Sequence, residues 1–194
     1  MKENRAVFAM LAVSVLINVV LAHKLRQFNE FFGTKAEQLL QPGTMVHSFE
    51  AVDLKGQIQT VAYNKESKPV VLYIFTPPCS WCARNLDNFK TLVQKKSGEY
   101  RFIGLSLSEE GLSQYVANND LKLPVYSRLL PQTRAAYKLG GTPQTIVVSP
   151  EGRVLENWPG AYVGGQKTQV EAFFHLMLPG IRPAAESGKA RGSE

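Results

Sequence analysis

Two cysteines separated by two residues, Cys79 and Cys82, are the only cysteines of this 194-residue chain. A disulfide between them would close a loop of a few residues, and stabilisation by a disulfide grows with loop length, so the pair is poorly placed to staple a domain. A structural zinc site requires four ligands, of which one such pair supplies two. The spacing therefore favours thiol-disulfide chemistry, in which the pair exchanges electrons.

The pair lies between an apolar strand-like run and a segment with helical periodicity, so Cys79 is predicted at a helix N-terminus. Unpaired backbone N–H groups and the helix dipole favour an anion there by about 0.3–2 kcal/mol. Since one pKa unit is about 1.36 kcal/mol, the pKa of the Cys79 thiol should fall from about 8.5 by at most about one and a half units. Cys82 follows one turn later, more buried, so Cys79 is predicted to attack and Cys82 to resolve the mixed disulfide.

The hydrophobic pattern of residues 42–181 predicts strands alternating with helices, and hence an α/β domain with a mixed central sheet flanked by helices. Residues 45–54 and 57–62 predict an opening β-hairpin around the turn Lys55-Gly56. Further strands are expected at residues 69–75, 102–107, 123–126, 145–149 and 153–158, and the last two are expected to pair across the turn at 150–152. Helices are expected from residue 79 to a cap at Gly98, around 112–116, over 131–139 before Gly140, and around 170–177, where Val170, Phe173, Phe174 and Met177 form the apolar face.

An uncharged run of seventeen residues, Ala6 to Ala22, lies near the N-terminus. As a helix it would be about 26 Å long, close to the thickness of a bilayer's hydrocarbon core. Secretory signals usually have shorter apolar regions, so an uncleaved transmembrane helix is expected, although residues 20–22 would also suit cleavage. Residues 1–23 are thus predicted to be a membrane anchor or signal segment, 24–41 a juxtamembrane stalk and 182–194 a disordered tail.

The side of the membrane on which the domain lies is not decided by charge. Basic residues stand both before the apolar run, at Lys2 and Arg5, and after it, at Lys24 and Arg26. A single N-terminal apolar segment normally delivers the rest of its chain across the membrane. We therefore expect a single-pass protein of the cytoplasmic (inner) membrane, with its soluble domain on the extracytoplasmic, periplasmic side.

The net charge of +6 is spread along the chain without a cluster of basic and aromatic residues, so nucleic-acid binding is not predicted. The histidines His23, His47 and His175 lack the spacing of metal ligands, and no metal or other cofactor is predicted. A copper-delivery protein that uses two cysteines and a distant histidine is an alternative. His175 is expected on a helix, however, and such a ligand usually lies on a loop.

From about residue 42 to 180 the chain resembles thioredoxin-fold proteins of the TlpA/ResA-like, membrane-anchored kind, within the redoxin or AhpC/TSA superfamily. The resemblance rests on the entry segment 42–56, the strand VVLYIF, the motif CSWC, and the sequence GTPQT at 141–145. It implies a cis peptide bond between Thr142 and Pro143 that faces the active-site disulfide. The Thr142 backbone would then be placed to pair with a bound peptide. The resemblance also implies a thioredoxin-like fold with the N-terminal hairpin as an extension.

Two positions near the cysteines depart from the family pattern. Pro78 stands where members usually have Trp before the first cysteine, and the tryptophan appears inside the motif as Trp81. Pro78 and Trp81 are both expected on the substrate-binding surface. Because they depart from the family pattern, the shape of that surface is not predicted. Tyr73 stands where thioredoxins have a buried Asp six residues before the first cysteine. Proton transfer to and from Cys82 then needs another group.

The resemblance to ResA-like proteins implies a functional glutamate after the next strand, and Glu109 occupies the matching place. The resemblance therefore makes Glu109 a candidate catalytic residue. The presence of Glu109 is explained equally well by a second role, in which an acid at a helix N-terminus interacts with the helix dipole and has no connection to the thiols. A catalytic role requires the side chain to point inward into apolar surroundings.

These observations predict a membrane-tethered, extracytoplasmic thiol-disulfide oxidoreductase. The family suggests that it reduces disulfides in exported proteins, with apocytochrome c as one client, and that a transmembrane electron donor restores the dithiol. A peroxiredoxin-like peroxidase is an alternative, because Thr76 precedes Cys79 by three residues. That family also requires a proline where Leu72 stands. A non-enzymatic holdase or copper-delivery module using the Thr142-Pro143 groove is the third possibility.

Overall fold

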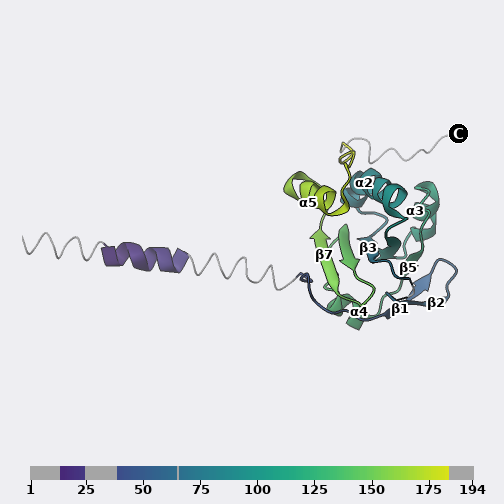
Figure 1. Ribbon diagram of the computed structural model, residues 1–194, viewed down its shortest axis with the longest axis horizontal. Helices are drawn as coiled ribbons and strands as arrows, with labels where there is room; N and C mark the ends of the chain where they lie inside the picture. The colour runs from purple at the N-terminus through teal and green to yellow at the C-terminus, as the bar shows by residue number, and fades with distance from the viewer. Residues whose placement is uncertain (1–13, 25–38, 65, 184–194) are drawn as a thin grey trace, which may run out of the picture. The chain divides into compact units, whose positions relative to one another are not determined.

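The computed structural model describes residues 14–24, 39–64 and 66–183, and the chain divides into two compact units between residues 39 and 40. In the first unit, residues 14–24 form a helix (Figure 1). Within the described ranges, no helix has both the length and the apolar character needed to cross a membrane. Residues 6–13 of the predicted span, 25–38 of the predicted stalk and 184–194 of the predicted tail lie outside the described residues.

The described part of the second unit contains a mixed seven-stranded sheet in the order β2-β1-β5-β4-β3-β6-β7. Its middle strands are parallel and are joined by helices, as the alternating hydrophobic pattern predicts. They are β3 (Val70–Phe75), β4 (Arg101–Ser106) and β5 (Val125–Ser127). Parallel strands joined in this way end at one edge of the sheet, where ligands and reactive groups gather.

A β-hairpin borders the parallel strands on each side. The predicted opening hairpin is confirmed as β1 (Phe49–Asp53) and β2 (Ile58–Val61), with β1 antiparallel to β5. The second hairpin consists of β6 (Gln144–Val148) and β7 (Val154–Pro159), with β6 antiparallel to β3. Because β6 runs against β3, the start of β6 lies beside the end of β3.

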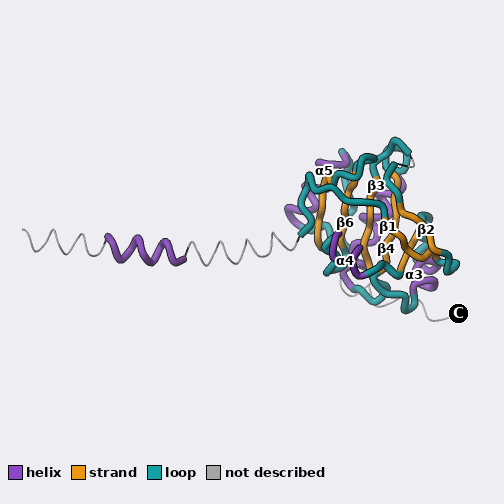
Figure 2. The backbone as a smooth tube through the Cα atoms, turned by 90° about the horizontal axis from the view of Figure 1, so that it is seen from below, coloured by secondary structure: helices purple, strands orange, loops and turns teal. Residues whose placement is uncertain are grey.

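Helices cover both faces of the sheet. On one face lie α2 (Ser80–Lys96), α3 (Leu112–Asn118) and α5 (Gly164–Phe174), as Figure 1 shows above the strands. The short α4 (Pro131–Ala136) and the residues that follow it lie on the opposite face, which is nearer the viewer in Figure 2. The predicted thioredoxin-like arrangement of a mixed sheet between helices is confirmed.

Strand β3 is buried along its whole length, which explains its continuous apolar sequence. Alternate side chains belong to two separate cores, one on each face of the sheet. Those on the α2 side are Val71, Tyr73 and Phe75, and those on the α4 side are Val70, Leu72 and Ile74. The ring of Tyr73 stacks on Phe89 of α2 with 3.9 Å between centroids, which fixes the helix against the strand.

Three predicted helix ends differ from the structure, that of α2 by one residue and those of α4 and α5 by three residues. Helix α2 is capped by Ser97 in a right-handed conformation rather than by Gly98, and near the end of α4 the left-handed residue is Lys138 instead of Gly140. Helix α5 ends at Phe174, because His175 takes a left-handed conformation. Met177 was predicted on the apolar face of that helix, but it lies beyond the turn and is 80% exposed.

The turn between β6 and β7 requires a glycine. Gly152 has a φ of +87°, and a Cβ atom there would lie 2.5 Å from the Val46 carbonyl oxygen. We expect Gly152→Ala to lower the free energy of unfolding by about 1–3 kcal/mol, measured by urea denaturation. The control is Gly98→Ala, where no atom lies within 4 Å and φ is not positive. Equal stability of the two variants would contradict the prediction.

Candidate active site

Cys79 lies at the N-terminus of α2, as predicted, and serves as its N-cap residue. The loop after β3 closes tightly, with the Cys79 backbone N–H donating to the Thr76 carbonyl oxygen at 3.1 Å. The Cys79 sulfur accepts a hydrogen bond from the Cys82 backbone N–H at 3.0 Å. A helix N-terminus supplies such N–H groups because its first residues have no partner within the helix. The sulfur of Cys79 is thus held where a negative charge is favoured.

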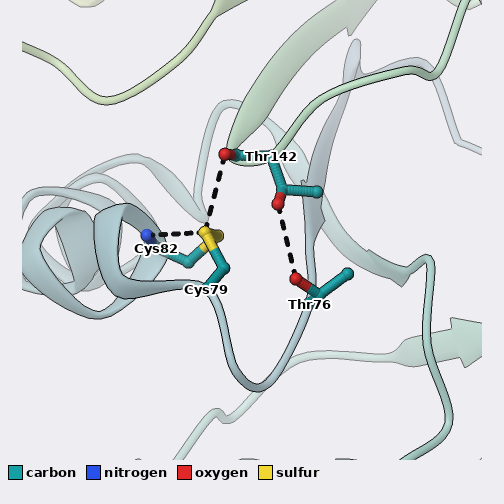
Figure 3. The surroundings of a disulfide bond; sticks show 4 residues. All are labelled: Thr76, Cys79, Cys82 and Thr142. Atoms are coloured by element: carbon teal, nitrogen blue, oxygen red, sulfur yellow. Dashed lines mark hydrogen bonds between the residues drawn. A yellow bond between two sulfur atoms is a disulfide. The ribbon is translucent and has the colours of Figure 1, made fainter.

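Cys79 and Cys82 are joined by a disulfide, with their Cα atoms 5.2 Å apart (Figure 3). Cys82 is completely buried and belongs to the core on the α2 side of the sheet. Cys79 is partly exposed at the surface. An incoming thiol or disulfide can therefore reach Cys79 and not Cys82, which agrees with the predicted order of attack.

The segment before β6 lies beside the disulfide. Ile74 at the end of β3 pairs with Gln144 at the start of β6, and this register places the preceding Thr142-Pro143 segment next to the Cys79 loop. The peptide bond between Thr142 and Pro143 is cis, as the family resemblance implied. The Thr142 carbonyl oxygen is 3.5 Å from the Cys79 sulfur (Figure 3), a contact that becomes an S–H donor bond when Cys79 is a thiol.

A groove of about 270 Å³ borders the cis-proline. Three of the four predicted substrate-binding residues, Trp81, Thr142 and Pro143, line it, together with Pro159, Gly160, Ala161, Val163 and Gln166. Trp81 is 46% exposed, and the Arg84 guanidinium lies over its ring, 4.3 Å from the centroid. The fourth residue, Pro78, is exposed in the loop before Cys79 and is not part of the lining. The tryptophan inside the motif therefore forms one wall of the groove.

Glu109 follows β4, as predicted, but its carboxylate takes part in polar contacts. It forms an ion pair with Arg128 and accepts a hydrogen bond from the Ser127 hydroxyl at 3.3 Å. Half of the side chain is exposed. The inward-facing, apolar position that a proton-transfer role requires is therefore not the one this side chain occupies. Its contacts join the loop after β4 to the end of β5.

Buried polar side chains on α2 are site features that the sequence analysis missed. Asn85 and Asn88 are both fully buried, and Asn85 Oδ1 accepts from Asn88 Nδ2 and from the Tyr162 backbone N–H, each at 3.0 Å. The Tyr162 hydroxyl bonds to Thr145 at 2.6 Å, and burial raises its pKa. The sequence feature that could have revealed them is the presence of two asparagines on the apolar face of a helix, because asparagine is a poor helix former.

Two of the histidines considered as metal ligands lie at the surface of the second unit. His47 and His175 are both exposed, and His175 is the cap residue beyond α5, so the prediction that it lies within the helix was wrong. Among the residues that the structure describes, no three His, Cys, Asp or Glu side chains are grouped to hold a metal ion.

The position of Cys79 predicts its reactivity. In a Cys82→Ser variant, the rate of alkylation should reach half its maximum about 1–1.5 pH units below the value of about 8.5 for a free thiol, because the helix N-terminus stabilises the thiolate. Iodoacetamide labelling as a function of pH measures this midpoint. The control is Cys79→Ser, in which the buried Cys82 should react more slowly. A midpoint equal to that of an unstructured peptide would contradict the prediction.

Comparisons with known proteins agree with this site. A model of the AhpC/TSA family matches residues 42–157. The thiol-disulfide oxidoreductase ResA of Bacillus cereus is 24% identical over 183 residues, which cover 92% of this chain and 100% of that protein.

Solved structures share the fold. The thioredoxin domain of a thiol-disulfide oxidoreductase from Bacteroides vulgatus matches with a TM-score of 0.56 and 22% identity, covering 70% of this chain and 99% of that one. StoA from Bacillus subtilis matches with a TM-score of 0.52 and 13% identity, covering 68% and 99%. Together with the Cys79–Cys82 disulfide, these matches show that the chain belongs to the AhpC/TSA family and is a thioredoxin-fold thiol-disulfide oxidoreductase of the ResA-like kind.

Proposed function

We propose that this chain reduces disulfides in exported proteins while tethered to the membrane. The observation that carries the proposal is the disulfide itself, with an accessible Cys79 at a helix N-terminus and a buried Cys82 behind it. The reducing direction is supported by the family resemblance of residues 42–180 and by the modest stabilisation that one helix end gives a thiolate. Arg84 is the first basic residue along α2, and its guanidinium lies over the Trp81 ring.

The reduced pair would act in two steps. The Cys79 thiolate attacks a sulfur of the client disulfide, a new bond forms between Cys79 and that sulfur, and the other client sulfur leaves with the electron pair and takes up a proton. Cys82, after losing its proton, attacks Cys79, and the first client sulfur leaves as a second thiol. Two electrons pass from the enzyme to the client, and the enzyme is left with the observed disulfide.

The groove beside Pro143 would hold the client during these steps. Its wall includes the exposed apolar side chains of Trp81 and Val163, which suit an apolar residue next to the client cysteine. The Thr142 backbone faces the Cys79 sulfur, where an extended client segment would lie against it as an added strand. Binding by backbone pairing and a shallow apolar surface tolerates many client sequences.

The proposed location rests on the sequence of residues 6–22, which is uncharged and long enough for a membrane span. The domain would then face the extracytoplasmic side, where exported proteins acquire disulfides. Apocytochrome c is one client class that the family suggests. Regeneration of the dithiol would require an electron donor that passes electrons across the membrane.

The proposed direction predicts a reducing potential. The Cys79/Cys82 couple should lie more than about 100 mV below that of strongly oxidising thioredoxin-fold proteins, as measured by equilibration with glutathione. In an insulin-reduction assay Cys79→Ser should abolish turnover, whereas Cys82→Ser should accumulate a mixed disulfide, because attack remains and resolution is lost. An oxidising potential would contradict the direction. Appreciable turnover of hydrogen peroxide would instead favour the peroxidase alternative.

The proposed tether predicts where the protein is found in cells. The full chain should sediment with membranes, and a chain lacking residues 1–23 should be released, because the uncharged run supplies the anchor. In intact spheroplasts, a membrane-impermeant thiol reagent should label Cys79 of the full chain carrying Cys82→Ser. Labelling only after lysis would place the domain in the cytoplasm, and full-length chain in the soluble fraction would rule out the anchor.

A further inference from the structure

Two hydrogen-bond donors near the disulfide are buried without a partner. The Tyr73 hydroxyl and the Asn85 side chain lie beside each other, and neither the hydroxyl nor the Asn85 nitrogen, Nδ2, makes a well-formed hydrogen bond to any residue that the structure describes. Both side chains are almost completely buried, Tyr73 at 2% exposure and Asn85 at 0%. Buried polar groups are nearly always paired, so two unpaired donors close together need an explanation.

The orientation of the Asn85 amide is fixed by its neighbours. The Tyr162 backbone N–H can only donate, so the atom 3.0 Å from it must be the oxygen Oδ1. Asn88 Nδ2 donates to the same oxygen at 3.0 Å, while Asn88 Oδ1 accepts from the Gly180 backbone N–H at 2.8 Å. These contacts leave Nδ2 of Asn85 directed elsewhere in the core, with two N–H bonds to offer.

Tyr73 is also held in place and remains a donor at working pH. Its ring is stacked on Phe89, and in the sheet it lies beside Thr145, whose hydroxyl is bonded to that of Tyr162. Burial raises the pKa of Tyr73 well above its usual value, and the side chain of Asn85 beside the hydroxyl opposes this only in part. The hydroxyl therefore stays protonated.

Both donors lie on the side of the sheet where Cys82 is buried. Asn85 follows Cys82 by one turn of α2, and both are fully buried, so they lie on the same face of the helix. Tyr73 and Cys82 belong to the same core. In the disulfide the Cys82 sulfur is uncharged and needs no strong donor. When the disulfide opens, this sulfur must carry a negative charge in apolar surroundings, which raise the pKa of a thiol.

We propose that the Tyr73 hydroxyl and the Asn85 side-chain amide are the hydrogen-bond donors that stabilise the Cys82 thiolate, directly or across one bridging water molecule. They are positioning residues for the resolving step of thiol-disulfide exchange. Their role depends on that exchange at the Cys79/Cys82 pair and is independent of the client, the direction and the location proposed above.

The resolving step forms one sulfur–sulfur bond and breaks another. The Cys82 thiol loses its proton to solvent, and the thiolate, held by the two donors, forms a bond to Cys79. The bond between Cys79 and the client sulfur breaks, and that sulfur leaves with the electron pair and takes up a proton. The donors keep their own protons throughout, so they lower the barrier by stabilising charge and not by accepting a proton.

Other ionisable groups also face this core and bear on its pH dependence. Cys79 lies on α2, Tyr115 on α3, and Tyr162 in the segment between β7 and α5. Arg182, from the segment after α5, acts on Tyr115 and lowers its pKa slightly against the larger effect of burial. Of these groups only the two cysteines are expected to titrate near neutral pH.

The first test measures the pKa of Cys82 alone. In the full chain carrying Cys79→Ser, the ultraviolet absorbance of the thiolate is followed against pH with and without Tyr73→Phe. Phenylalanine keeps the ring stacked on Phe89 and removes only the hydroxyl, so the pKa of Cys82 should rise by about one unit. The matched control is Tyr63→Phe, a buried tyrosine in the core on the other face of the sheet. It should leave the pKa of Cys82 unchanged.

The second test separates resolution from attack. With both cysteines present and a client peptide disulfide in a single turnover, Tyr73→Phe should slow release of the mixed disulfide by about tenfold at a pH below the pKa of Cys82. Formation of the mixed disulfide should keep its rate, and the deficit should shrink as pH rises. An unchanged Cys82 pKa in the folded Tyr73→Phe variant would overturn the proposal, as would equal slowing of both steps. Because absorbance reports the thiolate without a client, failure of the reductase proposal would not affect the first test.

Discussion

The antiparallel pairing of β6 with β3 is the constraint on which this active site depends. With Ile74 opposite Gln144, the residues that leave β3 and those that enter β6 must meet at one end of the sheet. That meeting places the Thr142 carbonyl oxygen 3.5 Å from the Cys79 sulfur and sets the cis-proline as a wall of the groove. A shift of one residue would turn the side chains of β6 to the opposite face and would separate the groove from the thiols.

Helix α2 gives the two sulfurs different surroundings with a single element. Its first turn holds Cys79 at the surface among backbone N–H groups, and one turn later Cys82 is fully buried. The helix end favours a thiolate at Cys79 by at most about 2 kcal/mol. Burial acts in the opposite direction on Cys82, and an apolar core without donors would shift the pKa of a buried group upward by several units. The buried polar side chains of Tyr73 and Asn85, on the same side of the sheet as Cys82, are thus as much a part of the site as the exposed sulfur.

The contacts of Glu109 and Tyr73 show how this chain differs from the pattern it resembles. The carboxylate after β4 pairs with Arg128 near the surface, and the strand position where thioredoxins have an acid carries a tyrosine. A tyrosine hydroxyl that stays protonated can donate a hydrogen bond to a thiolate, whereas an acid can also accept its proton. The chemistry required of the two kinds of residue is therefore different, although both serve the same buried sulfur.

The sequence by itself determined the local features of this protein: the CxxC pair at the start of a helix, the buried strand before it, the two hairpins and the α/β order. These follow from hydrophobic period and turn residues, which act over a few positions. The helix ends were predicted less accurately, because Lys138 and His175 adopt left-handed conformations that are more common for glycine. Only the tertiary structure decided that Glu109 pairs with Arg128, that Trp81 lines the groove, and that Asn85 and Tyr73 lie unpaired behind Cys82. Such contacts join residues far apart in the chain, and no local pattern encodes which strands will bring them together.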